Sequence, residues 1–339
     1  METSKKVKQQ KKKVLLMGKS GAGKSSMRSI IFSNHVAKDV RRLGATIDVD
    51  KKRVKFLGNL LLDIWDCGGQ DAFTESYLTS QKSYVFGDVG VLIYVFDVES
   101  SDFTDGARGH SDRDLQTYGS IIAALDEYSP NARIFTLVHK MDLVANEYRN
   151  EVIRSKTAAI TARSGRFARR IGTYATSIWD ETLYRAWGSI VNSLIPNLDI
   201  VEEGLKDLQR VTEAEEVVLF EQNTFLTVTR VSSEIGDENP RGDRYERLSN
   251  IIKTFKNSLS GYTESNSSHQ FDSFTIKTGI FNLIINRLTY NTYVLVVFPP
   301  GEAELQCARL NILSAKDEFA RIESVAEGAD DDFRNLRGK

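Results

Sequence analysis

The chain has 339 residues, which at roughly 150 residues per domain predicts two domains and excludes a single small one. Hydrophobic residues make up 41% and charged residues 27% of the sequence, and 45 Lys and Arg against 46 Asp and Glu leave a net charge of −1. This is ordinary globular composition, and the even charge argues against a protein that acts mainly as a polycation, so we expect no nucleic-acid partner.

The cysteines and the apolar segments favour a protein of a reducing compartment, with the cytosol as the first expectation. Cys67 and Cys307 cannot form a disulfide framework or a four-ligand zinc site. No window reaches the roughly 18 to 20 apolar residues of a membrane span. The sequence has neither an N-terminal myristoyl glycine nor a C-terminal prenylation cysteine. The lysine-rich residues 1–11 favour a solubilising arm over a lipid-binding one, so we expect any membrane contact to be indirect.

The first half of the sequence alternates strands and helices, which is the pattern of an α/β domain with a mostly parallel sheet. We expect a helix over 24–33 and a hairpin with its turn at 58–59. Residues 100–112 are polar and predict a surface loop. A helical face over 179–194 ends before Pro196, where we expect the first domain to close. Strands are predicted at 14–17, 52–56, 60–65, 91–96 and 134–138.

From about residue 199 the pattern changes to consecutive strands with two helices, which predicts an α+β domain. One helix has its apolar face over 248–259, and Gly261 can end it. The final helix carries an apolar seam over 305–322, at alternating steps of three and four residues. Such a seam faces either its own sheet or another helix, and the few heptads present favour its own sheet. Strands are predicted at 216–220, 225–231, 271–277, 281–286 and 293–298, the last three largely antiparallel.

A phosphate-binding motif follows the first predicted strand. Residues Gly18 to Ser25 read GKSGAGKS, which satisfies G-x-x-x-x-G-K-[ST] in the required strand-to-helix setting. The glycines allow backbone N–H groups to turn inward around phosphates, and Lys24 supplies a full positive charge. Ser25 would place its hydroxyl on Mg²⁺. The residues of this loop predicted to bind nucleotide are Ser20, Gly21, Ala22, Gly23, Lys24, Ser25 and Ser26.

A second motif, DCGGQ from Asp66 to Gln70, directly follows a predicted strand, in the position of a Walker-B-type carboxylate. Asp66 can bind Mg²⁺ through a water, Gly69 lets a backbone N–H approach the γ-phosphate, and Gln70 is placed to orient an attacking water. D-x-x-G is common by itself, and it gains weight here because it comes about 40 residues after Lys24.

Thr46 lies between these two motifs, in the segment GATID. It can bond the γ-phosphate and Mg²⁺ only when a triphosphate is bound, which would order this segment and release it after hydrolysis. The alternative is an ordinary turn threonine, and the order of the motifs favours the switch. The predicted metal ligands are therefore Ser25, Thr46 and Asp66, and the predicted catalytic residues are Lys24, Thr46 and Gln70.

A base-reading element, His139-Lys140-Met141-Asp142, ends the strand predicted at 134–138. Asp142 has the two acceptor oxygens needed for a bidentate bond to the N1–H and the exocyclic amine of guanine, and adenine does not present that arrangement. Lys140 can lie over the base plane. Thr176-Ser177-Ile178 follows a late strand, where a backbone N–H such as that of Ile178 could reach guanine O6. The predicted ligand is therefore GTP or GDP with Mg²⁺.

This order of motifs is that of small GTPases, and the chain closely resembles the Rag GTPases of the A/B branch, called Gtr proteins in fungi. The resemblance spans the chain and weakens after residue 200. His139 stands where most small GTPases have the asparagine of N-K-x-D; histidine there is a signature of this family, and its ring N–H can replace an amide donor. The resemblance rests on the segments KKKVLLMGKSGAGKSSMRSIIFSN, RRLGATIDV, FLGNLLLDIWDCGGQDAFTESY, VLIYVFDVES, LVHKMDLV and TSIWDETLYRAW.

The resemblance implies a P-loop small-GTPase domain followed by an α+β longin/roadblock-type domain that forms a heterodimer with a C/D-type Rag GTPase. It also implies residence on the cytoplasmic face of the vacuole or lysosome through a scaffold complex, besides the cytoplasm. Amino-acid availability would be relayed to a subunit of the target-of-rapamycin kinase complex. We assign a basic arm, a GTPase domain, a dimerisation domain and a polar tail to residues 1–11, 12–196, 197–323 and 324–339.

The leading functional hypothesis is a slow GTP hydrolase that acts as a switch. The alternative is a non-hydrolysing module that holds GTP while the second domain does the work, and the presence of Gln70 and Thr46 favours the first. A membrane-traffic GTPase would share the first domain but would not explain the second. No intrinsic arginine finger can be assigned, although Arg41 and Arg42 are near the switch. We therefore expect reliance on a GTPase-activating protein, which in related systems raises the rate by about 10³ to 10⁵.

Overall fold

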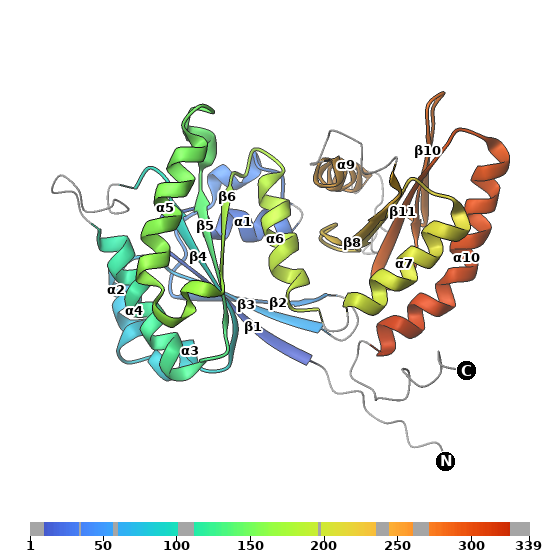
Figure 1. The fold of residues 1–339 in the computed structure, drawn as a ribbon. Coiled ribbons are helices and arrows are strands. Elements are labelled where there is room, and N and C mark those ends of the chain that lie inside the picture. The colour runs from blue at the N-terminus through green and yellow to red at the C-terminus, as the bar shows by residue number, and fades with distance from the viewer. Residues whose placement is uncertain are drawn as a thin grey trace, which may run out of the picture. The chain divides into compact units, whose positions relative to one another are not determined.

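The computed structural model describes residues 10–33, 35–56, 60–100, 112–195, 198–234, 244–259 and 271–325. They form two compact units (Figure 1). The N-terminal unit comprises Lys11–Val54 and Leu62–Ala186, and the C-terminal unit comprises 55–61 and the chain from Trp187 onward. The hairpin turn predicted at 58–59 and most of the loop predicted at 100–112 lie outside the described residues.

The N-terminal unit is built on one six-stranded sheet. Its strands are β1 (Gln10–Met17), β2 (Val49–Lys55), β3 (Leu60–Cys67), β4 (Val89–Asp97), β5 (Arg133–His139) and β6 (Ile171–Thr176), in the order β2-β3-β1-β4-β5-β6. The pairs β1–β4, β4–β5 and β5–β6 are parallel. The short connection between β2 and β3 makes that pair antiparallel. The predicted α/β class with a mostly parallel sheet is confirmed.

Helices cover both faces of this sheet. They are α1 (Lys24–Phe32), η1 (Asp39–Arg42), α2 (Asp71–Leu78), α3 (Lys82–Phe86), α4 (Arg113–Tyr128), η3 (Met141–Leu143), α5 (Arg149–Arg163), η4 (Gly165–Arg169) and α6 (Thr182–Asn192). α1 and α6 lie on one face, and α4 and α5 lie on the other (Figure 1). Val91 to Phe96 of β4 are almost inaccessible because this strand lies between β1 and β5 and under both helix layers.

The strand register brings three strand ends to one edge of the sheet. Met17 of β1 pairs with Tyr94 of β4, Asp97 of β4 pairs with His139 of β5, and His139 pairs in turn with Thr176 of β6. Loops that leave the carboxyl ends of parallel strands therefore meet here, and this edge of an open α/β sheet is where ligands usually bind.

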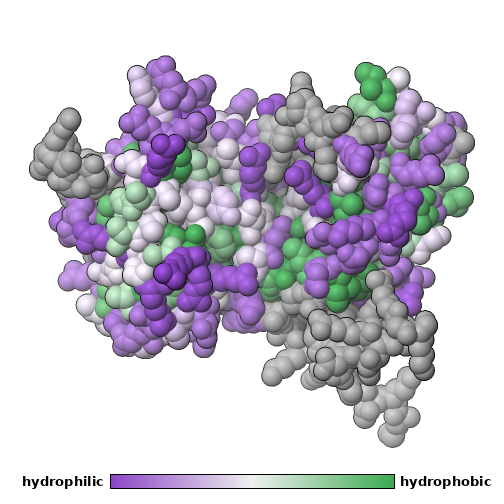
Figure 2. All heavy atoms as spheres, in the orientation of Figure 1, coloured by the Kyte–Doolittle hydropathy of each residue, from purple (hydrophilic) through white to green (hydrophobic). Residues whose placement is uncertain are grey.

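Three sequence-based expectations need correction in this unit. The strand predicted at 52–56 begins three residues earlier, at Val49. Trp179, which the pattern placed on the last helical face, lies before α6, because the Asp180 carboxylate accepts the Thr182 N–H at 3.0 Å and starts the helix there. The segment 149–170 received no assignment, yet it forms α5 and η4. α5 buries Ile160 and is otherwise largely polar, so it lacks an apolar period; Figure 2 shows hydrophilic side chains over it.

The C-terminal unit is a five-stranded sheet with three further helices. The elements are α7 (Leu198–Thr212), β7 (Glu216–Glu221), β8 (Thr227–Ser232), α9 (Arg244–Leu259), β9 (Ser273–Lys277), β10 (Asn282–Arg287), β11 (Thr292–Phe298) and α10 (Glu302–Val325). The strand order is β8-β7-β11-β10-β9, and every pairing is antiparallel. The predicted second domain with an antiparallel sheet is confirmed. β8 begins at Thr227 instead of 225, because Phe225 adopts a φ of 52° in the preceding turn.

The apolar seam of α10 is buried inside this unit. Leu305, Ala308 and Ile312 are at most 1% exposed, and Phe319 and Ile322 at most 3%. The seam packs against α7 as well as against β10, so the favoured expectation of packing on the sheet alone is incomplete. No helix among the described residues is sufficiently long and apolar to span a membrane.

Candidate active site

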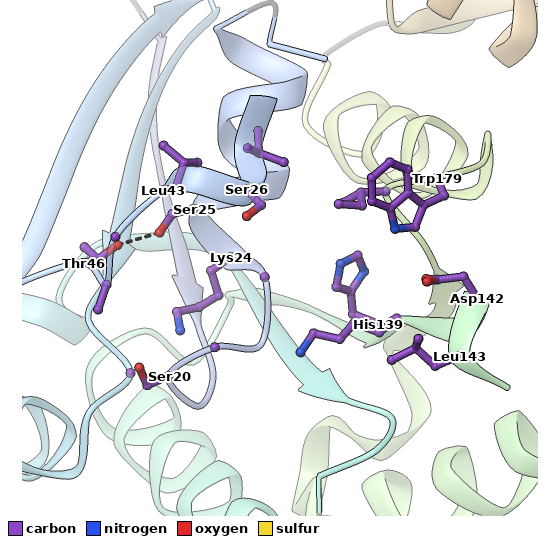
Figure 3. A pocket seen from close by; sticks show the side chains of 18 residues that line it. Ser20, Lys24, Ser25, Ser26, Leu43, Thr46, His139, Asp142, Leu143 and Trp179 are labelled. Atoms are coloured by element: carbon purple, nitrogen blue, oxygen red, sulfur yellow. Dashed lines mark hydrogen bonds between the residues drawn. The ribbon is translucent and has the colours of Figure 1, made fainter. Parts of the chain in front are cut away.

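A cavity of about 570 Å³ opens at the carboxyl edge of the N-terminal sheet. This volume is in the range of small-molecule and cofactor sites. Figure 3 shows Lys24, Ser25 and Thr46 on one side of the cavity and His139, Asp142 and Trp179 on the other. The cavity is lined by Ser20, Gly21, Gly23, Lys24, Ser25, Ser26, Val40, Leu43, Gly44, Ala45, Thr46, Gly69, His139, Lys140, Asp142, Leu143, Ile178 and Trp179.

The structure brings most of the predicted site residues together, and three of them do not line the cavity. Ala22 is 1% exposed, and its N–H donates to Lys19 O within the loop at 3.2 Å. Asp66 is fully buried behind Ser25. Gln70 is the residue before α2 and is partly exposed.

Close backbone approach explains the glycines of the phosphate loop. Gly18 has a φ of 137°, and a Cβ there would lie 2.2 Å from Val95 O. A Cβ on Gly69 would lie 2.2 Å from Gly18 O, and the Ser20 N–H donates to Gly69 O at 2.8 Å. The two motifs thus touch through backbone atoms, which side chains would prevent.

Lys24 is folded back on this loop. Its Nζ donates to Gly18 O at 2.7 Å and to Lys19 O at 2.9 Å. Burial lowers the pKa of Lys24, and the negative charge of Asp66 opposes that shift. The ammonium group therefore lies beside backbone N–H groups and the start of α1, where a phosphate group would find both charge and donors.

The predicted metal ligands form a set of oxygen donors. Ser25 Oγ and Thr46 Oγ1 are 2.5 Å apart (Figure 3). Neither carboxylate oxygen of Asp66 has a hydrogen-bond partner among the described residues, and its contact is an ion pair with Arg28 Nε at 3.1 Å. Burial raises the pKa of Asp66, while Ser25, Arg28 and Lys24 oppose this.

These donors fit Mg²⁺, which binds proteins through one or two carboxylates and hydroxyls and takes its other ligands from phosphate and water. The described residues contain no group of three or more His, Cys, Asp or Glu side chains that could hold a metal ion. With one carboxylate and two hydroxyls, the predicted set leaves coordination positions that phosphate oxygens and water would fill.

His139 lies between the side of the cavity predicted to bind the base and the phosphate loop. It is 2% exposed, and its Nδ1 lies 3.0 Å from Thr176 Oγ1. A Cβ on Gly23 would lie 2.9 Å from His139 Nε2, so the ring packs directly on the loop. Burial, aided by the charge of Lys140, lowers the pKa of His139 to about 4, so the ring is neutral at pH 7.

Asp142 and Lys140 are each held by a neighbouring side chain. Ser177 Oγ donates to Asp142 Oδ1 at 2.6 Å, and Lys140 Nζ donates to Asp97 Oδ2 at the same distance. The hydrogen bond from Ser177 fixes Oδ1 of Asp142 and with it the orientation of the whole carboxylate, which lines the cavity. Asp97 was not predicted, and Ser177 was named only as part of the segment Thr176-Ser177-Ile178, without its contact to Asp142.

Sequence reasoning also missed Trp179 and Arg28. Trp179 is 44% exposed and lines the cavity. The sequence pattern placed it on the apolar face of a helix, so it was not considered as a cavity residue. Arg28 follows Ser25 by three residues on α1, and this i,i+3 spacing was the available signal that it lies under the metal ligands.

The fold and the site define a P-loop GTPase. The conserved region of Gtr1/RagA G proteins matches residues 13–252. GTP-binding protein gtr1 of Schizosaccharomyces pombe is 47% identical over 320 residues, which cover 94% of this chain and 98% of that protein. Ras-related GTP-binding protein A of Dictyostelium discoideum is 44% identical over 312 residues, 92% and 98% of the two chains. GTP-binding protein GTR2 of Saccharomyces cerevisiae is 28% identical over 225 residues, 66% and 62% of the two chains.

The chain therefore belongs to the Gtr1/RagA family of G proteins. The resemblance to the A/B branch is confirmed by the family match and by the relatives of 44% and 47% identity. The chain is accordingly a GTP-binding protein of a family of GTPases.

Proposed function

We propose that this GTPase is a slow, Mg²⁺-dependent switch whose segment around Thr46 responds to the γ-phosphate. The observation that carries the proposal is the 2.5 Å separation of Ser25 Oγ and Thr46 Oγ1 beside the buried Asp66 carboxylate. A segment that supplies one of the metal ligands is held when the metal and the triphosphate are bound, and it is released when they are not.

In this proposal Ser25, Thr46 and Asp66 hold Mg²⁺, which when bound neutralises charge on the β- and γ-phosphates. Lys24 and the loop N–H groups bind the phosphates, and Asp142 reads guanine. Gln70 orients the attacking water. Gln70 lies outside the cavity lining, which supports an additional rearrangement or an activating protein before hydrolysis. The same observation favours the second candidate, a GTP-bound scaffold module that does not hydrolyse.

Single-turnover hydrolysis of bound GTP separates the two candidates. We expect slow phosphate release from the wild-type protein and none above background from Gln70→Leu, with GTP still bound. Ser25→Asn should lose triphosphate more than diphosphate, because Mg²⁺ coordination matters more for the former. No phosphate release above background from the wild type would favour the scaffold module, and equal release above background from wild type and Gln70→Leu would show that Gln70 does not position the water.

We also propose that the C-terminal unit forms a heterodimer with a C/D-type Rag GTPase. Ras-related GTP-binding protein C of Homo sapiens is 24% identical to this chain over 228 residues, so the family contains such a second branch. β9 is an edge strand of the sheet. Phe274 of β9 is 36% exposed, and Ile280, three residues after the strand, is 83% exposed. An edge strand with apolar side chains is a surface on which another chain can pair.

Co-purification with a C/D-type Rag tests this proposal. Ile251 of α9 and Leu310 of α10 are both 64% exposed on helices, so they form a matched pair of lysine substitutions. We expect Leu310→Lys to weaken the heterodimer more than Ile251→Lys, because the neighbouring Arg309 donates to Thr275 Oγ1 of β9 at 3.2 Å, whereas α9 contacts β8 at the opposite edge of the sheet. We also expect heterodimerisation to survive deletion of residues 1–195. A monomeric 196–339 fragment by light scattering, with the partner present, would refute this placement of the interface.

The cellular role is proposed from the family relationship. We propose that the protein relays amino-acid availability to a subunit of the target-of-rapamycin kinase complex, from the cytoplasmic face of the vacuole or lysosome, where a scaffold complex holds it and a GTPase-activating protein acts on it. Deleting residues 1–11 should leave vacuolar localisation largely intact. Flotation of the purified protein with anionic liposomes at physiological salt, abolished by that deletion, would show that the lysine arm is a direct anchor.

A further inference from the structure

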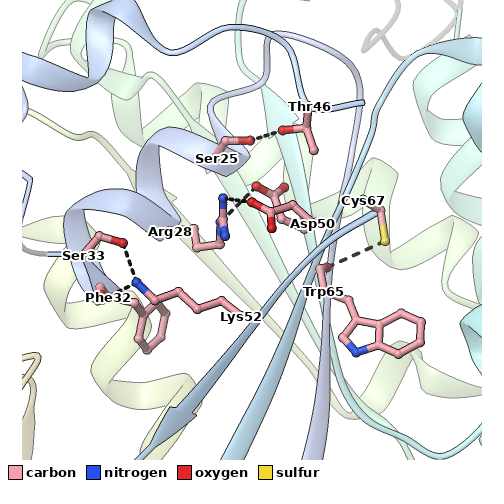
Figure 4. Close-up of polar contacts among 10 residues, drawn as sticks. Ser25, Arg28, Phe32, Ser33, Thr46, Asp50, Lys52, Trp65 and Cys67 are labelled. Atoms are coloured by element: carbon pink, nitrogen blue, oxygen red, sulfur yellow. Dashed lines mark hydrogen bonds and ion pairs between the residues drawn. The ribbon is translucent and has the colours of Figure 1, made fainter. Parts of the chain in front are cut away.

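Arg28 lies one turn beyond Ser25 on α1, and its guanidinium group contacts two carboxylates at once. Nε is 3.1 Å from Asp66 Oδ2, and Nη2 is 2.5 Å from Asp50 Oδ2 (Figure 4). The side chains of Arg28, Asp66 and Asp50 are 14%, 0% and 52% exposed. The arginine therefore connects the fully buried carboxylate of the metal site to a partly exposed carboxylate at the start of β2.

We propose that Arg28 and Asp50 act as a pair of positioning residues that set the Mg²⁺ affinity of the nucleotide site in opposite directions. Arg28 weakens Mg²⁺ binding. Asp50 strengthens it, because its carboxylate neutralises part of the positive charge that Arg28 directs at Asp66. This inference rests on the proposed Mg²⁺ site formed by Ser25, Thr46 and Asp66.

Two electrostatic effects of Arg28 have the same sign. Its positive charge repels a divalent cation beside the Asp66 carboxylate, where partial burial limits screening by water. It also compensates the buried charge of Asp66 when no cation is present, so Mg²⁺ has less to gain on arrival. Without Arg28, Mg²⁺ and Lys24 are left to compensate that charge.

Asp50 acts through Arg28. Its carboxylate shares the guanidinium group and neutralises part of the charge that faces the metal site. Without Asp50, the full charge of Arg28 would be directed at Asp66, and Mg²⁺ would bind more weakly. Because Asp50 belongs to β2, directly after the segment of Thr46, the pair also ties the metal carboxylate to the strand that follows the switch segment.

Lys52 provides a matched control for this contact between α1 and β2. Its Nζ donates to Phe32 O at 2.7 Å and to Ser33 Oγ at 2.5 Å (Figure 4). It is a cation on the same pair of elements that has no hydrogen bond to Asp66, and its charge acts on Arg28 and Asp50 only through space. If Arg28 served only to hold α1 against β2, replacing Lys52 should change Mg²⁺ binding in the same way as replacing Arg28.

The experiment measures the release rate of fluorescently labelled GDP from the full-length protein as a function of free Mg²⁺ concentration. We expect the midpoint to move at least about tenfold lower in Arg28→Gln and severalfold higher in Asp50→Asn, while Lys52→Gln follows the wild type. Arg28→Lys, which keeps the charge, should lie near the wild type. In the double variant Arg28→Gln/Asp50→Asn, the midpoint should match that of Arg28→Gln.

The outcomes separate this inference from the proposed metal site. Wild-type release that does not depend on Mg²⁺ would refute the metal site itself. Mg²⁺-dependent wild-type release with midpoints that move in the same direction, or not at all, in Arg28→Gln and Asp50→Asn would overturn the inference and leave the metal site standing. If Arg28→Gln does not fold, the direction of the shift in Asp50→Asn decides.

Discussion

Replacing His139 with asparagine should flatten the pH dependence of stability between pH 7.5 and pH 5. His139 is 2% exposed, with its ring between Thr176 and the backbone of Gly23. Burial lowers its pKa to about 4 from the 6.5 of a free histidine. Asparagine does not titrate in this range and retains a polar donor and acceptor.

The sign and the size of the effect follow from proton linkage. Below pH 6.5 the unfolded chain protonates His139 and the folded chain does not, so stability is complete above pH 6.5 and is lost as the pH falls toward 4. At pH 5 the loss from this one group is about 2 kcal/mol, and it approaches about 3 kcal/mol at pH 4. An asparagine at this position would contribute none of this loss.

Urea unfolding at pH 7.5 and pH 5, with fixed concentrations of GDP and Mg²⁺, measures the effect as a difference between variants. The wild type should lose about 2 kcal/mol more than His139→Asn between the two pH values. His35→Asn is the matched control, because His35 is exposed and outside the cavity lining, and it should follow the wild type. Parallel pH curves for wild type and His139→Asn would refute the buried, neutral histidine.

Three further predictions concern base recognition and packing. Asp142→Asn should weaken GTP and favour xanthosine triphosphate, because an amide replaces an acceptor opposite guanine; unchanged preference in nucleotide competition would show that Asp142 does not read the base. Gly69→Ala should lower nucleotide affinity and the thermal midpoint, because its Cβ would lie 2.2 Å from Gly18 O, whereas Gly279→Ala, outside the cavity lining and with open space around its Cβ, should be close to wild type in both measurements. Gly119→Ala, in a helix with open space, should stabilise the protein by about 0.5 to 1 kcal/mol in urea unfolding. Gly204→Ala gains the same helix propensity but brings a Cβ to 3.0 Å from Ile322 Cδ1 and 3.2 Å from Phe319 Cζ, so it should be less stable than Gly119→Ala by about 1 to 3 kcal/mol.

The fold class and the main motifs could be predicted because their signals are local. A buried parallel strand such as Val91 to Phe96 is apolar on both faces, and GKSGAGKS after an apolar strand leaves few other structures. α5 escaped prediction because Ile160 is its one fully buried residue, and a mostly polar helix carries no apolar period. Its existence depends on packing against α4, which no local pattern in 149–163 reports.

On the side of the cavity predicted to bind the base, His139, Lys140, Asp142 and Ile178 were predicted, whereas Trp179 and several of the contacts were not. The order of motifs placed His139 beside guanine as a replacement for an amide donor. In the structure, its Nδ1 lies near Thr176 and its Nε2 edge packs against Gly23. These neighbours are distant in sequence, and the register of β5 with β6 brings His139 and Thr176 side by side. The histidine thus connects β6, through Thr176, to the phosphate loop at Gly23.

The charges that surround the metal ligands show the same division between motif and fold. The helical spacing of Ser25 and Arg28 follows from the sequence, because residues three apart share a helix face. Whether the arginine meets Asp66 depends on how far β3 extends beside β1, and whether it meets Asp50 depends on where β2 begins. The motifs therefore supply the oxygen atoms of the proposed Mg²⁺ site, while the pairing of strands decides which charges lie beside them. If the proposed roles of Arg28 and Asp50 hold, two GTPases with the same metal-ligand residues can differ in Mg²⁺ affinity through neighbouring charges.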